Sequence, residues 1–368
     1  MVLAVVVLLA SADGCSSARD CNMAGNCITG SCACDVGFHG EACEALAMQS
    51  YKCGVGGLCL SNGTTTWGGS VVTADDGTHH MYAAMMTGNA TLKKWLTNSV
   101  VLHAVAPAGQ PHGPFSPAGV ALAPRSPPAF DSLMLHNPDA KRAPDGTYLI
   151  YYDGDSAGGA GADAHLNQRI GLATARSPYG PWNRSLVPIL SPSANSTAWD
   201  NLFVTNPGPY IFPNGSALLV YKAKGGSARA RAAMNTMKQG VAFADHWAGP
   251  YRRLTPDAPI ALPGDCEDPG VYRDPARGIF RMVLHCGCSY QLMWSADGIS
   301  WTKQGAERAS GWCSGFNYTD GSPGKLATRQ RPKWVTDATG AATHLMTGVN
   351  RPGDTGMGHT WTMANRLS

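Results

Sequence analysis

The sequence predicts an all-β protein, a five-bladed β-propeller that follows a small disulfide-rich module at the N-terminus. A short phrase ending in proline occurs four times, as His136-Asn137-Pro138, Thr205-Asn206-Pro207, Glu267-Asp268-Pro269 and Gln330-Arg331-Pro332. The prolines lie 69, 62 and 63 residues apart, and 69 residues before Pro138 the stretch Trp67-Gly68-Gly69-Ser70 opens a similar segment. Each phrase precedes a polar turn and an apolar run, so the chain contains five units of one kind.

A second marker keeps the same period, because a turn followed by an aromatic residue recurs in four units. The copies are His112-Gly113-Pro114-Phe115, Tyr179-Gly180-Pro181-Trp182, Ala248-Gly249-Pro250-Tyr251 and Asp297-Gly298-Ile299-Ser300-Trp301. Units of three or four short strands joined by such turns predict propeller blades, in which Trp182, Tyr251 and Trp301 pack one blade on the next. An irregular β-sandwich is the alternative, but two independent markers with one period favour the propeller.

Composition and charge argue against several classes of protein. Among 368 residues only 14% are charged, whereas Gly and Pro number 44 and 25, which favours a loop-rich β-protein. The net charge is +3 and basic residues form no cluster, so a nucleic-acid partner is not expected. No segment after the N-terminus is long and apolar enough for a transmembrane span. The oligomeric state is not predicted.

Cysteines and glycosylation sequons predict a protein that is secreted or held at the cell surface. The chain has twelve cysteines and six Asn-x-Ser/Thr sequons, which begin at Asn62, Asn89, Asn183, Asn195, Asn214 and Asn317. Residues 1–12 contain an apolar run and the pattern Ala10-Ser11-Ala12, which is typical of a cleaved signal peptide. A membrane anchor is the alternative, but eight apolar residues are too few to cross a bilayer.

Residues 13–44 hold six closely spaced cysteines. The pattern Cys32-x-Cys34-x-x-Gly37-Phe38-x-Gly40-x-x-Cys43 resembles the end of an EGF-like module. This resemblance implies the disulfides Cys15–Cys27, Cys21–Cys32 and Cys34–Cys43. A zinc site is the competing interpretation, but paired Cys-x-x-Cys spacing is missing. We expect the module to be tethered to the propeller rather than packed on it.

Six further cysteines lie outside this module. Residues 45–66 are expected to form a linker or strap, in which Cys53 and Cys59 pair locally. Cys286 and Cys288 are too close in the chain to pair comfortably with each other. Cys266 is therefore expected to pair with one of them and Cys313 with the other, and the sequence leaves both arrangements open.

Residues 67–368 resemble the five-bladed β-propeller glycoside hydrolases of family 43 and their relatives of family 32. The resemblance rests on the repeated x-Asn/Asp-Pro openings, the five units, and the run Ile170-Gly171-Leu172-Ala173-Thr174 that leads to Ser177-Pro178-Tyr179-Gly180-Pro181-Trp182. It implies a hydrolase of O-glycosidic bonds in a glycan or polysaccharide. It also implies that carboxylates at the openings of different blades do the chemistry, one as general acid and another as base or nucleophile. In such propellers the inner strands begin near the central axis, so we expect residues 137, 206, 268 and 331 to lie in one ring there.

The carboxylates depart from this pattern. Unit one opens with Trp67-Gly68-Gly69-Ser70, where the resemblance implies the base aspartate, and units two and three open with Asn137 and Asn206. Only the fourth opening has carboxylates, Glu267 and Asp268, and alternation along a strand would point them to opposite faces. We expect Glu267 to be the general acid, held protonated by burial or a neighbouring negative charge. Asp268 and Asp153 would then serve as helpers or base.

A second set of polar residues follows the openings at one register. Asp153 and Lys222 lie fifteen residues after their prolines, and His285 lies sixteen after Pro269. We expect these three side chains to share one layer of the propeller; surface turns are the alternative. Arg329 and Arg331 flank the fifth opening and could hold a carboxylate of substrate or protein. The residues predicted to bind substrate are Trp67, His136, Asn137, Asn206, Lys222, His285 and Arg331.

Some of these assignments have structural alternatives. Trp67 could stack on a sugar ring, although tryptophan is more often buried in a core. Histidines such as His136 and His103 more often have a structural role than a catalytic one. We predict no metal ligand and no cofactor.

Two functions follow from this sequence. The first is a secreted glycoside hydrolase whose partner is a carbohydrate substrate. The second is a carbohydrate-binding or cell-surface recognition propeller without catalysis. A protease or lipase is not expected, because the sequence lacks a Gly-x-Ser-x-Gly motif and a credible Ser/His/Asp set. Two axial carboxylates about 5–10 Å apart would favour the enzyme, and a lone carboxylate would favour binding.

Overall fold

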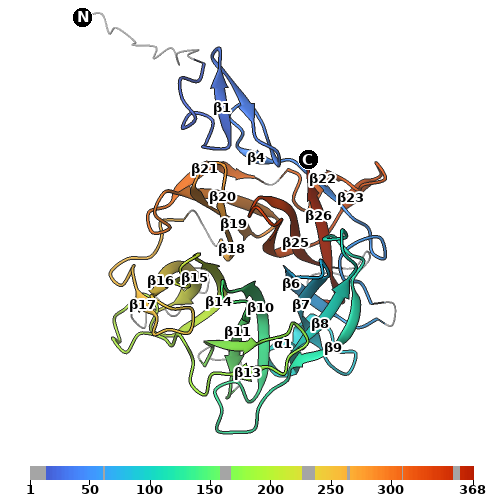
Figure 1. The fold of residues 1–368 in the computed structure, drawn as a ribbon, viewed down its shortest axis with the longest axis vertical. Coiled ribbons are helices and arrows are strands. Elements are labelled where there is room, and N and C mark those ends of the chain that lie inside the picture. Colours follow the sequence, from blue (N-terminus) through green and yellow to red (C-terminus); the bar gives the residue numbers. More distant parts are fainter. Residues whose placement is uncertain are drawn as a thin grey trace, which may run out of the picture.

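Five four-stranded antiparallel sheets stand around one axis, with a small module on their rim close to the C-terminus (Figure 1). The structure is a computed structural model that describes residues 14–60, 63–157, 167–225, 237–262, 266–308, 310–350 and 357–368. The predicted signal peptide and Asn62 lie outside these residues. The predicted five-bladed β-propeller is confirmed.

Four blades are built from strands that follow one another in the chain. Their innermost strands contact each other around the axis. The strands are β6 (Thr66–Thr73), β7 (His79–Met86), β8 (Ser99–Ala106) and β9 (Ser116–Leu122) in blade one; β10 (Met134–Arg142), β11 (Tyr148–Asp155), β12 (Arg169–Ala175) and β13 (Asn183–Arg184) in blade two; β14 (Phe203–Ile211), β15 (Ala217–Lys224), β16 (Lys238–Ala244) and β17 (Arg252–Arg253) in blade three; and β18 (Glu267–Asp274), β19 (Ile279–Cys286), β20 (Ser289–Ser295) and β21 (Thr302–Arg308) in blade four.

The fifth blade joins the two ends of the propeller. Its inner strands are β24 (Arg329–Thr336), β25 (Ala342–Asn350) and β26 (Thr360–Leu367), and its outer strand is β5 (Met48–Ser50). The segment predicted as a linker or strap therefore supplies a strand. Ser50 pairs with Asn365, and its hydroxyl donates to the Asn365 Oδ1 at 2.8 Å. This pairing closes the ring and removes the exposed edge of β26.

Aromatic residues of the second marker pack between neighbouring blades, as predicted. Trp182 meets Tyr82 edge to face at 5.4 Å, and the Tyr251 and Tyr151 hydroxyls lie 2.9 Å apart. A repeated polar network that was not predicted from the sequence lies beside them. In blade two Tyr152 donates a hydrogen bond to Asp131, and Asp131 pairs with Arg184. The residues 69 positions later form the same network in blade three, where Tyr221 donates to Asp200 and Asp200 pairs with Arg253. Both buried carboxylates are thereby neutralised.

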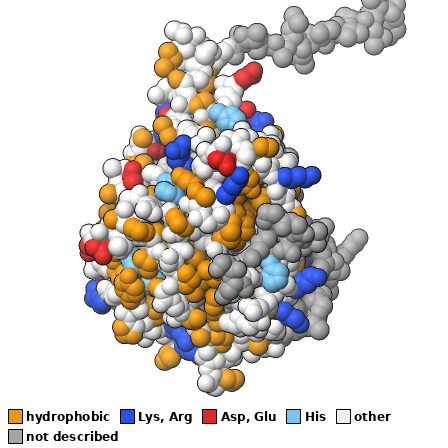
Figure 2. All heavy atoms as spheres, turned by 90° about the vertical axis from the view of Figure 1, so that its right-hand side faces the viewer, with side chains coloured by type: hydrophobic (Ala, Val, Ile, Leu, Met, Phe, Trp, Pro, Cys, Tyr) orange, Lys and Arg blue, Asp and Glu red, His pale blue; other side chains and the backbone are white. Residues whose placement is uncertain are grey.

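Helical structure is confined to one connection among the described residues. A 3₁₀ turn η1 (Leu92–Lys94) and the short helix α1 (Trp95–Asn98) join β7 to β8, and a hairpin of β22 (Ser314–Asn317) and β23 (Pro323–Lys325) lies between blades four and five. None of the helical segments described has the length and apolar character needed to cross a bilayer. Figure 2 shows Lys and Arg side chains scattered over one face rather than gathered into a basic patch.

The N-terminal module consists of two hairpins, β1 (Gly25–Ile28) with β2 (Ser31–Cys34) and β3 (Phe38–His39) with β4 (Ala45–Leu46). Its three predicted disulfides are confirmed, namely Cys15–Cys27, Cys21–Cys32 and Cys34–Cys43. The local Cys53–Cys59 bridge is also present. Of the two arrangements left open for the last four cysteines, the structure has Cys266–Cys286 and Cys288–Cys313.

The expectation of a merely tethered module is wrong, because the module packs on blade four. Phe38 and Leu46 share a core cluster with Tyr290 of β20. The buried Arg281 of β19 lies 4.7 Å over the Phe38 ring, donates to the Met23 carbonyl at 2.5 Å and pairs with Asp274. Cysteine spacing alone could not predict this contact, since the residues that receive the module belong to blade four.

Replacing Arg281 tests this docking. Arg281→Ala should lower the free energy of unfolding by about 3 kcal/mol, because it leaves the Asp274 carboxylate uncompensated and removes the contact with the module. Amide protons in residues 14–46 should then exchange faster. Arg252→Ala, an exposed arginine stacked on Phe243, is the control and should change stability by less than about 0.5 kcal/mol. Equal effects of the two variants would contradict the docking.

Candidate active site

A β-bulge interrupts all five inner strands at the same place. The pairing register shifts between His136 and Asp139 in β10, and equivalent shifts occur in β6, β14, β18 and β24. The residue at one equivalent position in each bulge has a positive φ. These residues are Gly68 (63°), Asn137 (48°), Asn206 (51°), Asp268 (64°) and Arg331 (56°). Glycine, asparagine and aspartate tolerate this conformation, and a bulge redirects the side chain it carries.

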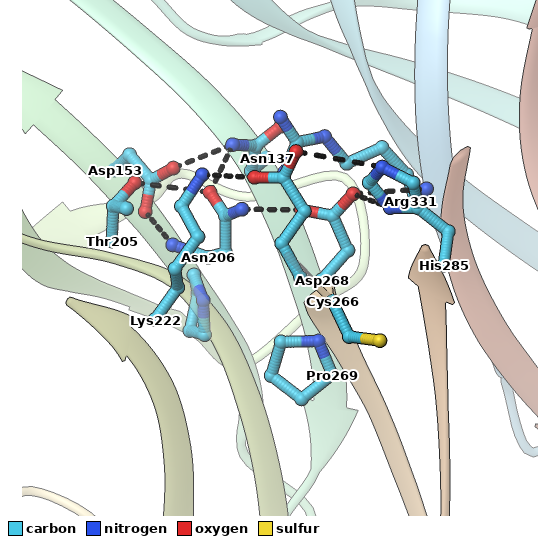
Figure 3. Close-up of polar contacts among 12 residues, drawn as sticks. Asn137, Asp153, Thr205, Asn206, Lys222, Cys266, Asp268, Pro269, His285 and Arg331 are labelled. Atoms are coloured by element: carbon cyan, nitrogen blue, oxygen red, sulfur yellow. Dashed lines mark hydrogen bonds and ion pairs between the residues drawn. The ribbon is translucent and has the colours of Figure 1, made fainter. Parts of the chain in front are cut away.

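The redirected side chains meet at the axis, as Figure 3 shows. The Asn137 amide donates to the Asn206 Oδ1 at 2.6 Å, and the Asn206 amide donates to the Asp268 Oδ1. Arg331 forms an ion pair with Asp268, and its backbone N–H donates to the Asp268 Oδ2 at 3.3 Å. The prediction that residues 137, 206, 268 and 331 lie in one ring near the axis is confirmed.

Blade one contributes no side chain to this ring. A Cβ placed on Gly68 would lie 3.0 Å from the Arg331 Cβ, so the Arg331 side chain covers the place where a blade-one side chain would begin. A side chain at the position where the resemblance implies the base aspartate would thus meet the methylene carbons of Arg331. The first blade opening lacks a carboxylate in the sequence, and in the structure the Arg331 side chain packs over that position.

The second strands supply a further layer around the ring. Asp153 pairs with His136, Lys222 with Thr205 and His285 with Glu267, each directly before a bulge. The prediction of one shared layer is confirmed. The Asp153 carboxylate accepts a hydrogen bond from the Asn137 amide at 2.7 Å and another from the Asn206 backbone N–H at 2.8 Å. Lys222 donates to Glu267.

The expectation that Glu267 and Asp268 point to opposite faces is wrong. His285 contacts both carboxylates, with its Nδ1 2.5 Å from the Asp268 Oδ2 and its Nε2 3.4 Å from the Glu267 Oε1. Alternation fails here because the bulge and the positive φ of Asp268 turn its side chain toward the side of its neighbour. Both carboxylates therefore belong to one cluster at the axis.

Exposure distinguishes the three carboxylates of the cluster. The Glu267 side chain is 25% exposed, whereas Asp268 is 1% and Asp153 is 0% exposed. A ligand that enters along the axis would therefore meet Glu267 first. Asp268 and Asp153 lie behind it and act on a ligand only through the residues that they hold.

The protonation of Glu267 differs from the expectation for a general acid. Burial by itself would raise the pKa of Glu267, but the charges of Lys222, His285 and Arg331 outweigh it and hold this pKa well below its ordinary value. Glu267 is therefore ionised in the free site. Asp153 behaves oppositely, since complete burial raises its pKa to about 6 despite hydrogen bonds from Thr205 and Asn137.

Two of the residues considered for the site have structural partners instead. Trp67 is 2% exposed and packs with Met86 and Leu92, so its ring faces are covered and cannot stack on a sugar. Arg329 is fully buried over Trp312 and Phe316 and does not join the axial cluster. The prediction that Trp67 binds substrate is therefore wrong.

His136 is buried against Trp95, with its Nδ1 2.7 Å from the Ser99 Oγ. Burial, and then Arg331 and Lys222, keep the pKa of His136 well below its usual value. His136 therefore borders the cluster as a neutral ring. His103 likewise has a buried partner, His80, at 2.8 Å.

Sequence reasoning missed the lysine beneath the ring. Lys333 of β24 donates to the Pro207 carbonyl at 2.6 Å and the Pro269 carbonyl at 3.0 Å, and it pairs with the buried Asp139 at 2.7 Å. A buried charge needs such partners. The available signal is position, because Lys333 and Asp139 each come directly after the proline of a repeated phrase.

Glu267, Asp268 and His285 also offer ligand atoms within 4.8 Å of one another, an arrangement that could hold a metal ion. Lys222 and Arg331 already pair with the two carboxylates, so their charge is balanced without a cation. The sequence prediction of no metal ligand stays a prediction.

Comparison with known proteins identifies both parts of the chain at the level of fold. The profile of the Teneurin-like EGF domain matches residues 18–45, and no curated protein matches the chain. Zg3597, a family 117 glycoside hydrolase from Zobellia galactanivorans, is similar with a TM-score of 0.61 and 15% identity, over 87% of this chain and 90% of that one. The propeller has a glycoside hydrolase fold.

Two further solved structures support this assignment. A thermostable family 43 glycoside hydrolase has a TM-score of 0.55 and 13% identity, over 83% of this chain and 90% of its own. An alpha-L-arabinofuranosidase from Lactobacillus brevis has a TM-score of 0.55 and 13% identity, over 82% and 90%. The predicted resemblance to family 43 propellers is thus confirmed for the fold, and the EGF-like module is confirmed by its own profile.

The burial of Asp153 makes stability depend on pH. Its folded pKa of about 6 lies above the ordinary 3.8, so its stabilising contribution is complete below pH 3.8 and is lost as the pH rises through 6. This change corresponds to about 3 kcal/mol. Asp153→Asn cannot titrate, so the free energy of unfolding of the variant should gain about that amount relative to the native protein between pH ~3.5 and ~7. If the free energies of unfolding of the two proteins, measured by denaturant titration, change with pH by the same amount, this prediction is wrong.

Proposed function

We propose that the chain is a secreted glycoside hydrolase that cleaves O-glycosidic bonds of a glycan or polysaccharide at the axial cluster. The observation that carries the proposal is Glu267, a partly exposed carboxylate at the axis whose neighbour Asp268 offers an oxygen within 4.8 Å. Glycosidases use carboxylates at the reacting bond, and Glu267 is the carboxylate of this cluster that a ligand can reach. The glycosidase fold around them adds support.

The ionised state of Glu267 favours a role as nucleophile or general base rather than general acid. Lys222 keeps the carboxylate charged and aimed, since the two side chains form an ion pair. Asp268 and Arg331 hold the opposite side of the cluster, and His285 lies between the two carboxylates and contacts both. These residues position Glu267, and Glu267 contacts the sugar.

Secretion is part of the same proposal. Asn89, Asn183, Asn195, Asn214 and Asn317, the sequon asparagines within the described residues, are all exposed. Each is therefore accessible to a glycan. All twelve cysteines form disulfides, which suits an oxidising compartment.

Removal of either axial carboxylate tests the proposal. A screen with aryl glycosides and with plant and algal polysaccharides should first identify a substrate. Glu267→Gln and Asp268→Asn should then lower kcat by at least about a hundredfold, the scale expected when a reacting or positioning carboxylate is lost. Glu41→Gln, an exposed glutamate of the N-terminal module, is the control and should keep full activity. Near-native rates in both axial variants, with normal folding, would place the chemistry elsewhere.

The pH profile tests the role of Glu267. Its pKa lies well below 4.5, so a nucleophile or base at this position stays active as the pH falls to 4.5 and loses activity only below it. A general acid would behave oppositely, because kcat/KM would fall as the pH rises through its pKa. A step in kcat/KM near pH 6 that disappears in Asp153→Asn would belong to Asp153.

The Arg331 side chain packs over Gly68, where a catalytic side chain of blade one would begin. This contact favours a second candidate function, carbohydrate binding without catalysis. In that case the first blade opening lacks the base of the family pattern, and the neighbouring Arg331 pairs with Asp268 instead. The same screen separates the two functions. Saturable binding of a glycan at the axis with no product after prolonged incubation would support recognition alone, and product formation would support the enzyme.

A further inference from the structure

A disulfide lies directly beside the axial cluster. Cys266 directly precedes Glu267 in the chain, two residues before Asp268 (Figure 3). Cys286 directly follows His285 and forms a disulfide with Cys266. Glu267 and His285 are register partners in β18 and β19, and their side chains are in contact. The disulfide therefore joins the two strands at the position next to this pair.

Blade four has the shortest run of strand pairing before its bulge. Strand β10 pairs with β11 at three positions before the bulge, and β14 pairs with β15 at three. The inner strands of blades one and five have two such positions each. Among the described residues β18 pairs with β19 there at one position, Glu267 with His285, and the register then shifts until Gly270. Of the five blades, blade four therefore gives the start of its inner strand the least support through strand pairing.

The disulfide supplies support at the point where strand pairing is shortest. Of the six disulfides, Cys266–Cys286 is the one that links the start of an inner strand to the second strand of the same blade. A disulfide keeps the two Cα atoms within about 7 Å of each other, so the strands cannot separate here. Blade three adds a hydrogen bond, because the buried Gln239 of β16 donates from its Nε2 to the Cys266 carbonyl at 3.0 Å. The residue before Glu267 is thus held by blades three and four.

The charge of Glu267 depends on where its backbone is held. Burial raises the pKa of Glu267, and Lys222, His285 and Arg331 together outweigh the burial. These three residues belong to blades three, four and five. Electrostatic attraction weakens with distance, so a segment that moves away from Lys222 loses part of what keeps the carboxylate ionised. The support of β18 at its start therefore affects the protonation of the site.

We propose that the Cys266–Cys286 disulfide is a positioning element of the axial site, which fixes the backbone of Glu267 within the cluster. The proposal rests on the function proposed above for Glu267, because the disulfide acts on a substrate only through that carboxylate. Removal of the bridge leaves the axial side chains unchanged but frees the start of β18 to move relative to β19. The distance between the Glu267 carboxylate and Lys222 is then no longer fixed.

Removal of the bridge from the whole protein tests the proposal. The double variant Cys266→Ala/Cys286→Ala leaves no free thiol. In a ¹³C NMR titration of the glutamate carboxyl groups, the Glu267 signal is identified by its loss in Glu267→Gln. The pKa of Glu267 should be higher in the double variant than in the native protein by at least about half a pH unit. With a substrate in hand, the acid limb of kcat/KM should move to higher pH by the same amount, and kcat should fall at least about tenfold.

The neighbouring bridge Cys288–Cys313 supplies the matched control. It spans 25 residues against 20 for Cys266–Cys286, and the stabilisation by a disulfide depends on the length of the loop it closes. Cys288→Ala/Cys313→Ala should therefore lose a similar amount of stability but keep the native pKa of Glu267 and the native pH profile. If Glu267 titrates at the same pH in both double variants, the proposal is overturned.

Gln239→Met tests the same support with both bridges intact. Methionine removes the hydrogen bond to the Cys266 carbonyl, and the buried Gln239 Oε1 has no hydrogen-bond partner to lose among the described residues. The pKa of Glu267 should rise by a smaller amount than without the bridge. If Cys266→Ala/Cys286→Ala does not fold, an unchanged pKa in Gln239→Met overturns the proposal. The NMR titration needs no substrate, so full activity of Glu267→Gln would count against the proposed function alone.

Discussion

The charge balance at Asp268 organises the centre of this propeller. One buried carboxylate interacts with an amide from blade three, a guanidinium from blade five and the imidazole of its own blade. A buried carboxylate without such partners would be strongly destabilising. The three contacts therefore tie neighbouring blades together at the point where their inner strands meet. They also hold Glu267 in place, because His285 touches both acids.

The bulge in each inner strand is what makes this convergence possible. It places a residue with positive φ directly before the proline in four blades, where the side chain turns to the axis instead of to a sheet face. Asparagine and aspartate accept this conformation readily, whereas arginine does so at a cost. At Arg331 the ion pair with Asp268 offsets that cost. The backbone geometry of the bulges and the polar contacts of the ring thus depend on each other at Asn137, Asn206, Asp268 and Arg331.

The period of the proline phrases was enough to predict five blades, the ring of residues 137, 206, 268 and 331, and the layer of Asp153, Lys222 and His285. Side-chain direction could not be predicted, because alternation holds only in regular strands and the bulge reverses it at Asp268. The roles of Arg329 and Trp67 depend on packing between distant segments, which local sequence does not encode. The docking of the N-terminal module depends in the same way on Arg281.

The outer strand of the fifth blade has a consequence for the order of folding. Ser50 and Asn365 are 315 residues apart, so the ring closes through one of the longest-range contacts in the chain. Contacts of such separation form slowly. During synthesis the disulfide-bonded module and β5 emerge before the propeller strands, so β5 cannot pair until β26 has been made. Until then the partly built ring exposes an unpaired sheet edge, which chaperones of the proposed secretory route would have to protect from aggregation.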